Sequence, residues 1–326
     1  MSALLFVVVT IVIAIVIRFY EKNTNAMCKS KKKLDGKIAI VTGGTAGMGL
    51  EIAKEFARRE AKVIIACPFK EEGVNARKEI VEETGNEKII FKLLDLSSIE
   101  SVRKFAADII NTEDRLDILI NNAGVGVPSD FVTADGMSFI MQVNYFGHFL
   151  LTLLLLPLLK KSGTSWQPSR IVNTSSILHQ IGAYDIRNLN RTDHWFMFQI
   201  YAKSKICLVL FARELTKRIN GSNVVINSVD PGAVGTRIFD SSGKIYGPIF
   251  TFLCNSLYKT PWEGAQTALY VALDSEAGEV SGEFFKNCAR ARAIKWAYSD
   301  KLARIIFDDS VKCVKLTDEE LNACLA

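Results

Sequence analysis

A tyrosine and a lysine four residues apart, Tyr201 and Lys205, are the residues of this chain whose types and spacing most directly indicate chemistry. They lie in a stretch that predicts a long helix, and at this spacing both side chains share one helical face. A phenol titrates near pH ~10 in water, and a nearby cation lowers its pKa by favouring the ionised form. The pair therefore suits proton transfer in reversible alcohol–carbonyl chemistry, although the same spacing also occurs on ordinary amphipathic helices.

The elements that must position this pair are predicted by apolar runs that alternate with amphipathic stretches from Lys37 onward. The runs are continuous and rich in β-branched residues, as in strands buried on both faces. The predicted strands are Ile38–Thr42, Val63–Cys67, Ile89–Leu94, Ile118–Asn121, Ile171–Thr174 and Val224–Val229. The predicted helices are Met48–Arg59, Glu72–Glu83, Ile99–Asn111, Phe139–Lys160 and Phe196–Asn220. This alternation indicates one α/β domain whose parallel sheet is covered by helices.

Glycines follow the first predicted strand in the segment Thr42-Gly-Gly-Thr-Ala-Gly-Met-Gly49, and a helix begins at once. Glycines permit a tight turn and close backbone approach, while the helix N-terminus offers free N–H groups to a pyrophosphate. The alternative is a tight strand–helix connection without a ligand. The second strand ends at Cys67 without the acidic residue that would bind an adenosine ribose and mark NAD.

Short polar side chains follow the later strands as well. Asp95 is placed either to meet an adenine amine or to cap the next helix, where Ser97 and Ser98 also stand. Small or hydroxyl-bearing residues end the next three strands, at 121–124, 173–176 and 230–236. The carboxyl ends of parallel strands meet at one edge of the sheet, where open α/β folds bind their ligands.

Composition restricts the function classes. The chain has 326 residues, of which 49% are hydrophobic and 23% charged, with a net charge of +5 and no basic–aromatic interleaving of the kind that nucleic-acid surfaces use. Its seven cysteines are scattered, odd in number and without CxxC spacing, which indicates reduced thiols and neither a disulfide framework nor a metal site.

The N-terminal segment is much more apolar than the rest of the chain. An apolar run from Ala3 to Ile17 is broken only by Thr10, and a lysine cluster follows it. The charge follows the run and no Ala-x-Ala site appears, which favours a retained anchor over a cleaved signal peptide. We therefore expect a transmembrane signal anchor at 1–20, a basic linker at 21–36 and one folded domain at 37–326. The positive-inside rule places the domain in the cytoplasm.

Together these motifs resemble the short-chain dehydrogenase/reductase family over residues 37 to 290. They are Thr42-Gly-x-x-x-Gly-x-Gly49, Asn121-Asn-Ala-Gly124, Asn144, the serine after the fifth strand, Tyr201-x-x-x-Lys205 and Pro231-Gly232. The resemblance implies a single-domain, doubly wound Rossmann-type parallel sheet of order 3-2-1-4-5-6-7. It also implies an NAD(P)-dependent oxidoreductase that acts on CH–OH groups.

By the same resemblance Tyr201 is the general acid/base, and Lys205 lowers its pKa and binds the nicotinamide ribose. Ser176, rather than Ser175, binds the substrate oxygen, and Asn144 holds a water that relays protons to the lysine. The cofactor-binding residues are expected to be Gly43, Thr45, Gly47, Met48, Gly49, Lys70, Asp95, Leu96, Asn122, Ala123, Gly124, Tyr201, Lys205, Pro231, Gly232, Val234 and Thr236.

Finer similarity points to the retinol-dehydrogenase-like branch of the family. Its signs are the segments Gln142–Thr152, Lys259–Thr267 and Ser281–Phe285, and a gap of 25 residues from Ser176 to Tyr201. Members of this branch are anchored at the endoplasmic reticulum and act on membrane-dissolved alcohols and aldehydes. The apolar segment within 238–258 suits a lid over a lipophilic substrate such as a retinoid, an isoprenoid or long-chain aldehyde, or a steroid; alternatively it packs on the domain.

The chain departs from its relatives at Pro68, where they commonly carry an arginine for the 2′-phosphate of NADP. Lys70 is the nearest substitute. NADP is favoured because the second strand lacks an acid, and NAD stays open. NADP would make the enzyme a carbonyl reductase in the cell. A homodimer through the long helices is an open expectation. The alternative of another class is a catalytically idle, cofactor-binding membrane scaffold or lipid-binding protein.

Overall fold

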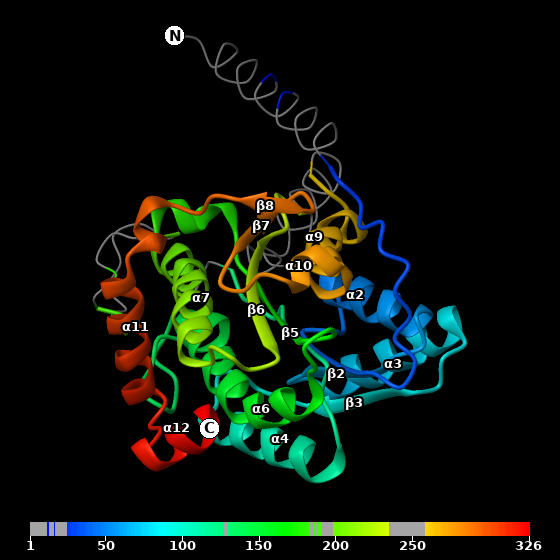
Figure 1. Cartoon of the computed structure of the whole chain (residues 1–326), viewed down its shortest axis with the longest axis horizontal. Coiled ribbons are helices and arrows are strands. Elements are labelled where there is room, and N and C mark those ends of the chain that lie inside the picture. Colours follow the sequence, from blue (N-terminus) through cyan, green and yellow to red (C-terminus); the bar gives the residue numbers. More distant parts are fainter. Residues whose placement is uncertain are drawn as a thin grey trace.

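An eight-stranded sheet of order β3-β2-β1-β4-β5-β6-β7-β8 forms the middle layer of the protein (Figure 1). The computed structural model describes Val12, Val16 and residues 25–126, 130–182, 186, 188–190, 198–234 and 258–326. The first seven strands are parallel and confirm the predicted order 3-2-1-4-5-6-7. The strands are β1 Ile38–Thr42, β2 Lys62–Cys67, β3 Ile89–Leu93, β4 Ile118–Asn121, β5 Ser169–Thr174, β6 Val224–Asp230, β7 Phe284–Lys286 and β8 Ala289–Ala291.

Strand β8 was not predicted. It is antiparallel to β7 and pairs Phe284 with Ala291 and Lys286 with Ala289. The turn between the two strands places Asn287 and Cys288 at φ values of 48° and 52°. This left-handed turn lets so short a hairpin close, and β8 thereby becomes one edge of the sheet.

Helices cover both faces of the sheet. One apolar cluster unites helices α4, α6 and α7 with one face, and a second unites α2, α3 and α9 with the other. The helices are α2 Gly47–Arg58, α3 Lys70–Thr84, α4 Ile99–Thr112, α5 Phe139–Met141, η1 Gln142–Phe146, α6 Gly147–Ser162, η2 Ile177–Ile181, α7 Gln199–Arg218, α9 Pro261–Leu273, α10 Ser275–Gly278, η4 Lys295–Tyr298, α11 Asp300–Cys313 and α12 Asp318–Leu325. The predicted helices are therefore confirmed within a few residues at each end.

The continuous helix Phe139–Ser162 is the one helix in the described part of the chain that is long and apolar enough to cross a membrane. Its most apolar stretch is 89% buried, so it serves as a core helix. The anchor expected at 1–20 lies outside the described residues apart from Val12 and Val16, which have helical backbone.

The segment before β1 packs on the domain from its first continuously described residues. Arg59 donates to the backbone oxygens of Lys32 and Ser30, each at 2.8 Å, and the Cys28 N–H donates to Oε1 of Gln266 at 3.1 Å. Leu34 is 1% exposed and belongs to the apolar cluster under α2. The described part of the expected linker is therefore bound to the domain.

Candidate active site

The loop between β1 and α2 lies directly against the end of β4. A Cβ at Gly43 would stand 2.9 Å from Cα of Ala123, and one at Gly49 would stand 2.1 Å from the carbonyl oxygen of Gly43. Gly43 also has a φ of 63°, which disfavours any side chain. Only glycine permits this packing, which brings the backbone of the loop and the Asn122–Ala123 turn together.

Thr42 fastens the two loops to each other. Its hydroxyl oxygen accepts hydrogen bonds from the backbone N–H groups of Asn122 at 2.9 Å and Ala123 at 3.1 Å, and the Asn122 side chain donates back to the Thr42 carbonyl at 3.0 Å. Buried hydrogen bonds of this kind hold two strand ends in fixed register.

The N-terminus of α2 suits a phosphate group. Ala46 at the N-cap makes no side-chain hydrogen bond, and the first turn contains no acidic residue. The first N–H groups of the helix therefore lack a side-chain acceptor, and the positive end of the helix dipole faces the loop. These residues fit the pyrophosphate of a dinucleotide. The side chains of Met48 and Val234 both pack on Gly264 of α9, where a Cβ added to this glycine would stand 2.8 Å from Met48 and 2.6 Å from Val234.

The end of β2 presents a thiol where an acid would bind a ribose. Cys67 is 5% exposed, and the Thr45 hydroxyl hydrogen-bonds its sulfur. Burial raises the pKa of this thiol, so the position stays neutral. Lys70, the first residue of α3, instead lines a depression beside β3 together with Leu93 and Ser98.

Asp95 makes a local turn. Its carboxylate accepts from the N–H of Ser97 at 2.8 Å and from its hydroxyl at 2.6 Å, while Ser98 caps α4 by accepting from the Ser101 N–H. Next to it, Leu96 packs on Gly147, whose missing Cβ would stand 2.7 Å from the Leu96 carbonyl oxygen. Asp95 thus stabilises the strand end, and its second carboxylate oxygen makes no hydrogen bond with a residue that the structure describes.

Four predicted residues converge where β4, β5 and α7 meet. The Ser176 hydroxyl lies close enough to the Tyr201 hydroxyl to lower the pKa of the phenol, and the ammonium of Lys205 lies 5.4 Å from the centre of the tyrosine ring. A Cβ at Gly124 would stand 3.4 Å from both Nζ of Lys205 and Oδ1 of Asn144. The four side chains therefore border one small space at the carboxyl edge of the sheet.

Neighbouring groups fix each of these side chains. Lys205 donates to the Thr174 carbonyl at 3.0 Å. Asn144 accepts from the Val125 N–H at 2.8 Å and donates to the Val125 carbonyl at 3.0 Å. It lies in η1, a π-helical turn within the longer helix, and such turns frequently occur at functional sites.

The two serines after β5 have different surroundings. The Ser175 hydroxyl is buried and donates to the Lys205 carbonyl at 2.8 Å, so it joins β5 to α7. Ser176 caps η2, where its hydroxyl accepts from the Leu178 N–H at 3.2 Å, and it is partly exposed beside Tyr201. Of the two, only Ser176 reaches the open side of the cluster.

The expected lowering of the tyrosine pKa is wrong for the protein as it stands. Burial raises the pKa of Tyr201 to about 12; the hydrogen bond from Ser176 opposes this rise and the charge of Asp230 adds to it. Burial also lowers the pKa of Lys205 to about 8. The missing physical element was desolvation, which is the largest cause of the shift in both members of the pair.

The turn after β6 completes the edge. Gly232 has a φ of 83°, and its N–H donates to Oδ1 of Asp230 at 3.0 Å. The other carboxylate oxygen of Asp230 lies 3.6 Å from Nζ of Lys286 on β7. Thr236 and most of the expected lid lie outside the described residues.

Two buried histidines support the cluster and were not predicted as site residues. His148 bridges the Asn144 carbonyl at 3.2 Å and the Thr42 hydroxyl at 2.9 Å, and burial lowers its pKa to about 3. His179 bridges the Ser176 carbonyl at 2.6 Å and the Ile294 N–H at 3.1 Å. Since a carbonyl only accepts, each neutral ring carries its proton on Nδ1. Sequence offered no signal for these roles, because their partners are backbone atoms or distant side chains.

Residues 37–246 match the family model described as short chain dehydrogenase. The chain belongs to the short-chain dehydrogenase family. It is therefore an NAD(P)-dependent oxidoreductase acting on alcohols and carbonyls, as expected.

Within the short-chain dehydrogenases, curated relatives include human retinol dehydrogenase 13, 39% identical over 90% of this chain and 89% of its own length. Mouse retinol dehydrogenase 11 is 40% identical over 88% and 89%. The resemblance to retinol dehydrogenases is thereby confirmed.

Solved short-chain dehydrogenases have the same fold. One is a Pseudomonas aeruginosa RhlG/NADP active-site complex, 26% identical, with a TM-score of 0.62 over 78% of this chain and 95% of that one. Another is a short chain dehydrogenase from Escherichia coli complexed with NADPH, 27% identical, with a TM-score of 0.60 over 78% and 97%.

Proposed function

We propose that this short-chain dehydrogenase uses NADP(H) to interconvert a lipophilic alcohol and its aldehyde or ketone, and that it works as a reductase in the cell. The observation that carries the proposal is the convergence of Tyr201, Ser176, Lys205 and Asn144 beside the glycine loop. A proton donor, a second hydroxyl and a buried cation meet there at the sheet edge where such folds bind their ligands.

In this mechanism the hydroxyls of Tyr201 and Ser176 both donate to the substrate oxygen and thereby orient the carbonyl carbon. When bound, the nicotinamide supplies or accepts the hydride. Tyr201 gives its proton to the oxygen as negative charge develops there, and the ammonium of Lys205 stabilises the phenolate that remains. Lys205 would also bind the ribose of the nicotinamide cofactor.

Asn144 has a positioning role in this proposal. Its side chain holds the backbone of Val125 and fixes the space next to Lys205, where a water would relay protons to the lysine. Since Asn144 and Lys205 are only 0% and 3% exposed, protons from solvent would reach the lysine through this water and not by direct contact.

The choice of NADP rests on the end of β2. A neutral thiol at Cys67 does not repel a 2′-phosphate, and the solved relatives from Pseudomonas and Escherichia are complexes with NADP and NADPH. Lys70 is our candidate for a phosphate contact, because it is exposed three residues further on. Glycine-loop contacts, Asn122 to Gly124 and the 231–236 turn would hold the rest of the cofactor.

The lipophilic substrate rests on the retinol dehydrogenase relatives and on two apolar segments, the N-terminal run and the stretch within 238–258. We propose a retinoid, an isoprenoid or long-chain aldehyde, or a steroid. An anchor at residues 1–20 would hold the domain at the cytoplasmic face of the endoplasmic reticulum, close to substrates dissolved in the bilayer.

The test is turnover of NADPH by the full chain on a panel of lipophilic and small polar carbonyls, beside the Tyr201→Phe variant. We expect activity on the lipophilic compounds only, and a fall of about 10²–10⁴-fold in kcat for the variant with unchanged NADPH binding. An enzyme that prefers small polar carbonyls would refute the substrate class. Wild-type protein that binds NADPH but turns over nothing would favour the idle scaffold.

A further inference from the structure

An exposed surface of mixed basic and apolar character extends from β8 to η2. We define the β8 surface by Ile177, Ile181, Arg290, Arg292, Lys295 and Trp296. Trp296 is 61% exposed, Ile181 50% and Ile177 39%, so large apolar side chains are exposed in both elements of this surface. Arg290 lies in β8 at the edge of the sheet, and Arg292 directly follows this strand.

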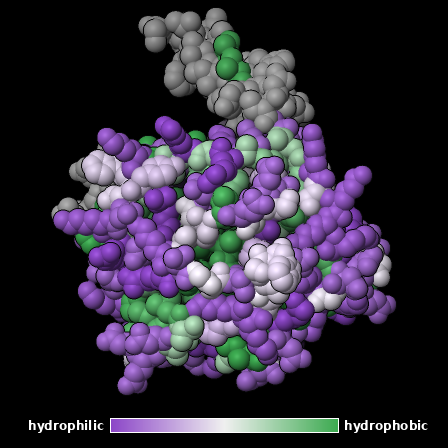
Figure 2. Space-filling view, in the orientation of Figure 1, coloured by the Kyte–Doolittle hydropathy of each residue, from purple (hydrophilic) through white to green (hydrophobic). Residues whose placement is uncertain are grey.

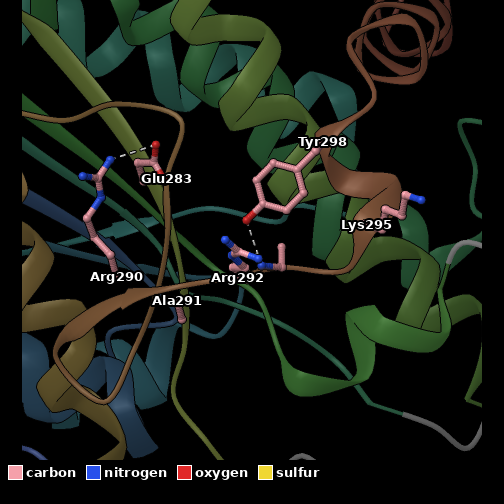
Figure 3. Close-up of a pocket in the computed structure, with 7 residues that line it drawn as sticks. Glu283, Arg290, Ala291, Arg292, Lys295 and Tyr298 are labelled. Carbon is pink, nitrogen blue, oxygen red and sulfur yellow. Dashed lines mark hydrogen bonds and ion pairs between the residues drawn. The ribbon is translucent and has the colours of Figure 1, made fainter.

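The basic side chains of this surface border a depression (Figure 3). Arg290 pairs with Glu283 at 2.9 Å, and the Tyr298 hydroxyl accepts from the Ala293 N–H at 3.1 Å. Arg292 and Lys295 form no ion pair with any residue that the structure describes. The depression therefore carries excess positive charge and suits an anionic group.

The two elements of the β8 surface are physically joined. The Ile294 N–H donates to Nε2 of His179 in η2 at 3.1 Å, and the His179 ring lies 4.8 Å from the ring of Phe284 on β7. The short helix that carries the two exposed isoleucines is thus held against the segment that carries Arg292 and Lys295. Strand β8 lies along the upper edge of the domain in Figure 1, and Figure 2 shows hydrophilic and hydrophobic residues mixed along this edge.

The same edge receives the beginning of the chain. Cys288, in the β7–β8 turn, donates from its thiol to the Ala26 carbonyl at 3.4 Å, and Cys28 binds Gln266. The apolar run ends at Ile17, and the eight residues from Arg18 to Asn25 span at most about 28 Å when extended. An anchored chain would therefore hold the β8 surface near a membrane.

We propose that the β8 surface docks on the anionic headgroups of the bilayer in which the N-terminus is anchored. Lys and Arg attract acidic lipid headgroups, and an indole lies favourably at the membrane–water boundary. Since Ser176 caps η2, this contact would hold the lipid next to the serine that lies beside Tyr201. The inference rests on the membrane anchoring proposed above.

The test uses the full chain in nanodiscs of phosphatidylcholine, with or without phosphatidylserine, whose acyl chains carry bromine as a fluorescence quencher. The contribution of Trp296 is the quenching lost in a Trp296→Phe variant. We expect this contribution to be large with phosphatidylserine. We also expect the double variant Arg292→Ala/Lys295→Ala to reduce it severalfold.

The matched control is Lys78→Ala/Lys104→Ala, on helices α3 and α4 at the opposite edge of the sheet; each side chain is 75% exposed. It should leave the quenching of Trp296 unchanged. The proposal is overturned if Trp296 is quenched in neither lipid, or if it is quenched equally in the two double variants. It is also overturned if Trp296 proves to be buried against a second copy of the protein. If the chain docks on the membrane but does not bind NADPH, the docking inference stands and only the proposed function is rejected.

Discussion

The backbone N–H of Ile294 donates to Nε2 of His179 across 115 positions of sequence, and the other nitrogen of the same ring donates to the carbonyl of Ser176. The imidazole thereby connects the segment after β8 to the serine beside Tyr201. Since His179 touches the backbone of Ser176 and not the reacting atoms, it is a positioning residue.

His179→Ala should lower kcat by about tenfold to a hundredfold, because the Ser176 hydroxyl loses its fixed position. NADPH binding should stay unchanged, since the glycine loop is untouched. His179→Asn, whose amide offers a donor near the place of Nδ1, should recover part of kcat. Steady-state kinetics and NADPH titration of the three proteins measure this, and equal losses in both variants would contradict it.

Substitution of the two neighbouring serines should distinguish their roles. Ser176→Ala removes a hydroxyl that points to the open side of the cluster, and we expect a fall of about 10²–10³-fold in kcat, with at most about 1 kcal/mol of unfolding free energy lost with the cap of η2. Ser175→Ala removes a buried hydrogen bond to the Lys205 carbonyl and should cost about 1 kcal/mol of unfolding free energy. Kinetics and denaturant unfolding distinguish the two, and the reverse pattern would place the active hydroxyl at Ser175.

Cofactor choice should respond to the end of β2. Cys67→Asp introduces a carboxylate where an acid binds the ribose of NAD, and we expect the Kd for NADPH to rise tenfold or more while that for NADH falls. Fluorescence titration with both cofactors measures this.

Lys70 can be tested in the same titration. Lys70→Ala should weaken NADPH binding but not NADH binding if its ammonium contacts the 2′-phosphate. Lys78→Ala on the same helix is the control and should change neither Kd. Equal NADPH affinity in all three proteins would remove Lys70 from the cofactor site.

Acid should destabilise the protein through His148. Its pKa lies near 6.5 in an unfolded chain and at about 3 in the fold, so the unfolded state binds more protons between these values. The stability contributed by the neutral ring is complete above pH ~6.5 and is lost as the pH falls toward 3, at up to ~1.4 kcal/mol per pH unit. His148→Gln should flatten the slope of unfolding free energy against pH, measured by denaturant titration of the full chain in detergent; an unchanged slope would assign it to other groups.

Much of the fold could be predicted because its signals are local. The β-branched runs set β1 to β6, and the glycine spacing marked the β1–α2 loop, since steric contacts at Gly43 and Gly49 admit no side chain. The Tyr201/Lys205 pair was found because helical spacing alone brings the two side chains together.

What could not be predicted depends on contacts between distant segments. The pairing of Asp230 with Lys286 and the bridge from His179 to Ile294 join residues whose proximity arises only when the sheet is complete. The predicted lowering of the Tyr201 pKa was wrong for a related reason. Burial is a property of the packed protein. The sequence shows that a lysine stands four residues from the tyrosine, but it does not show that packing excludes water from both side chains.

The bound N-terminal segment defines where the folding unit begins. Leu34 fills the core beneath α2, and the two hydrogen bonds from Arg59 reach as far back as Ser30. A shortened chain that starts at Lys37 would therefore expose a hollow in its core and leave a guanidinium without its carbonyl partners. A version of the enzyme that starts shortly before Cys28 would retain these contacts and should withstand heating better than one cut at the first strand.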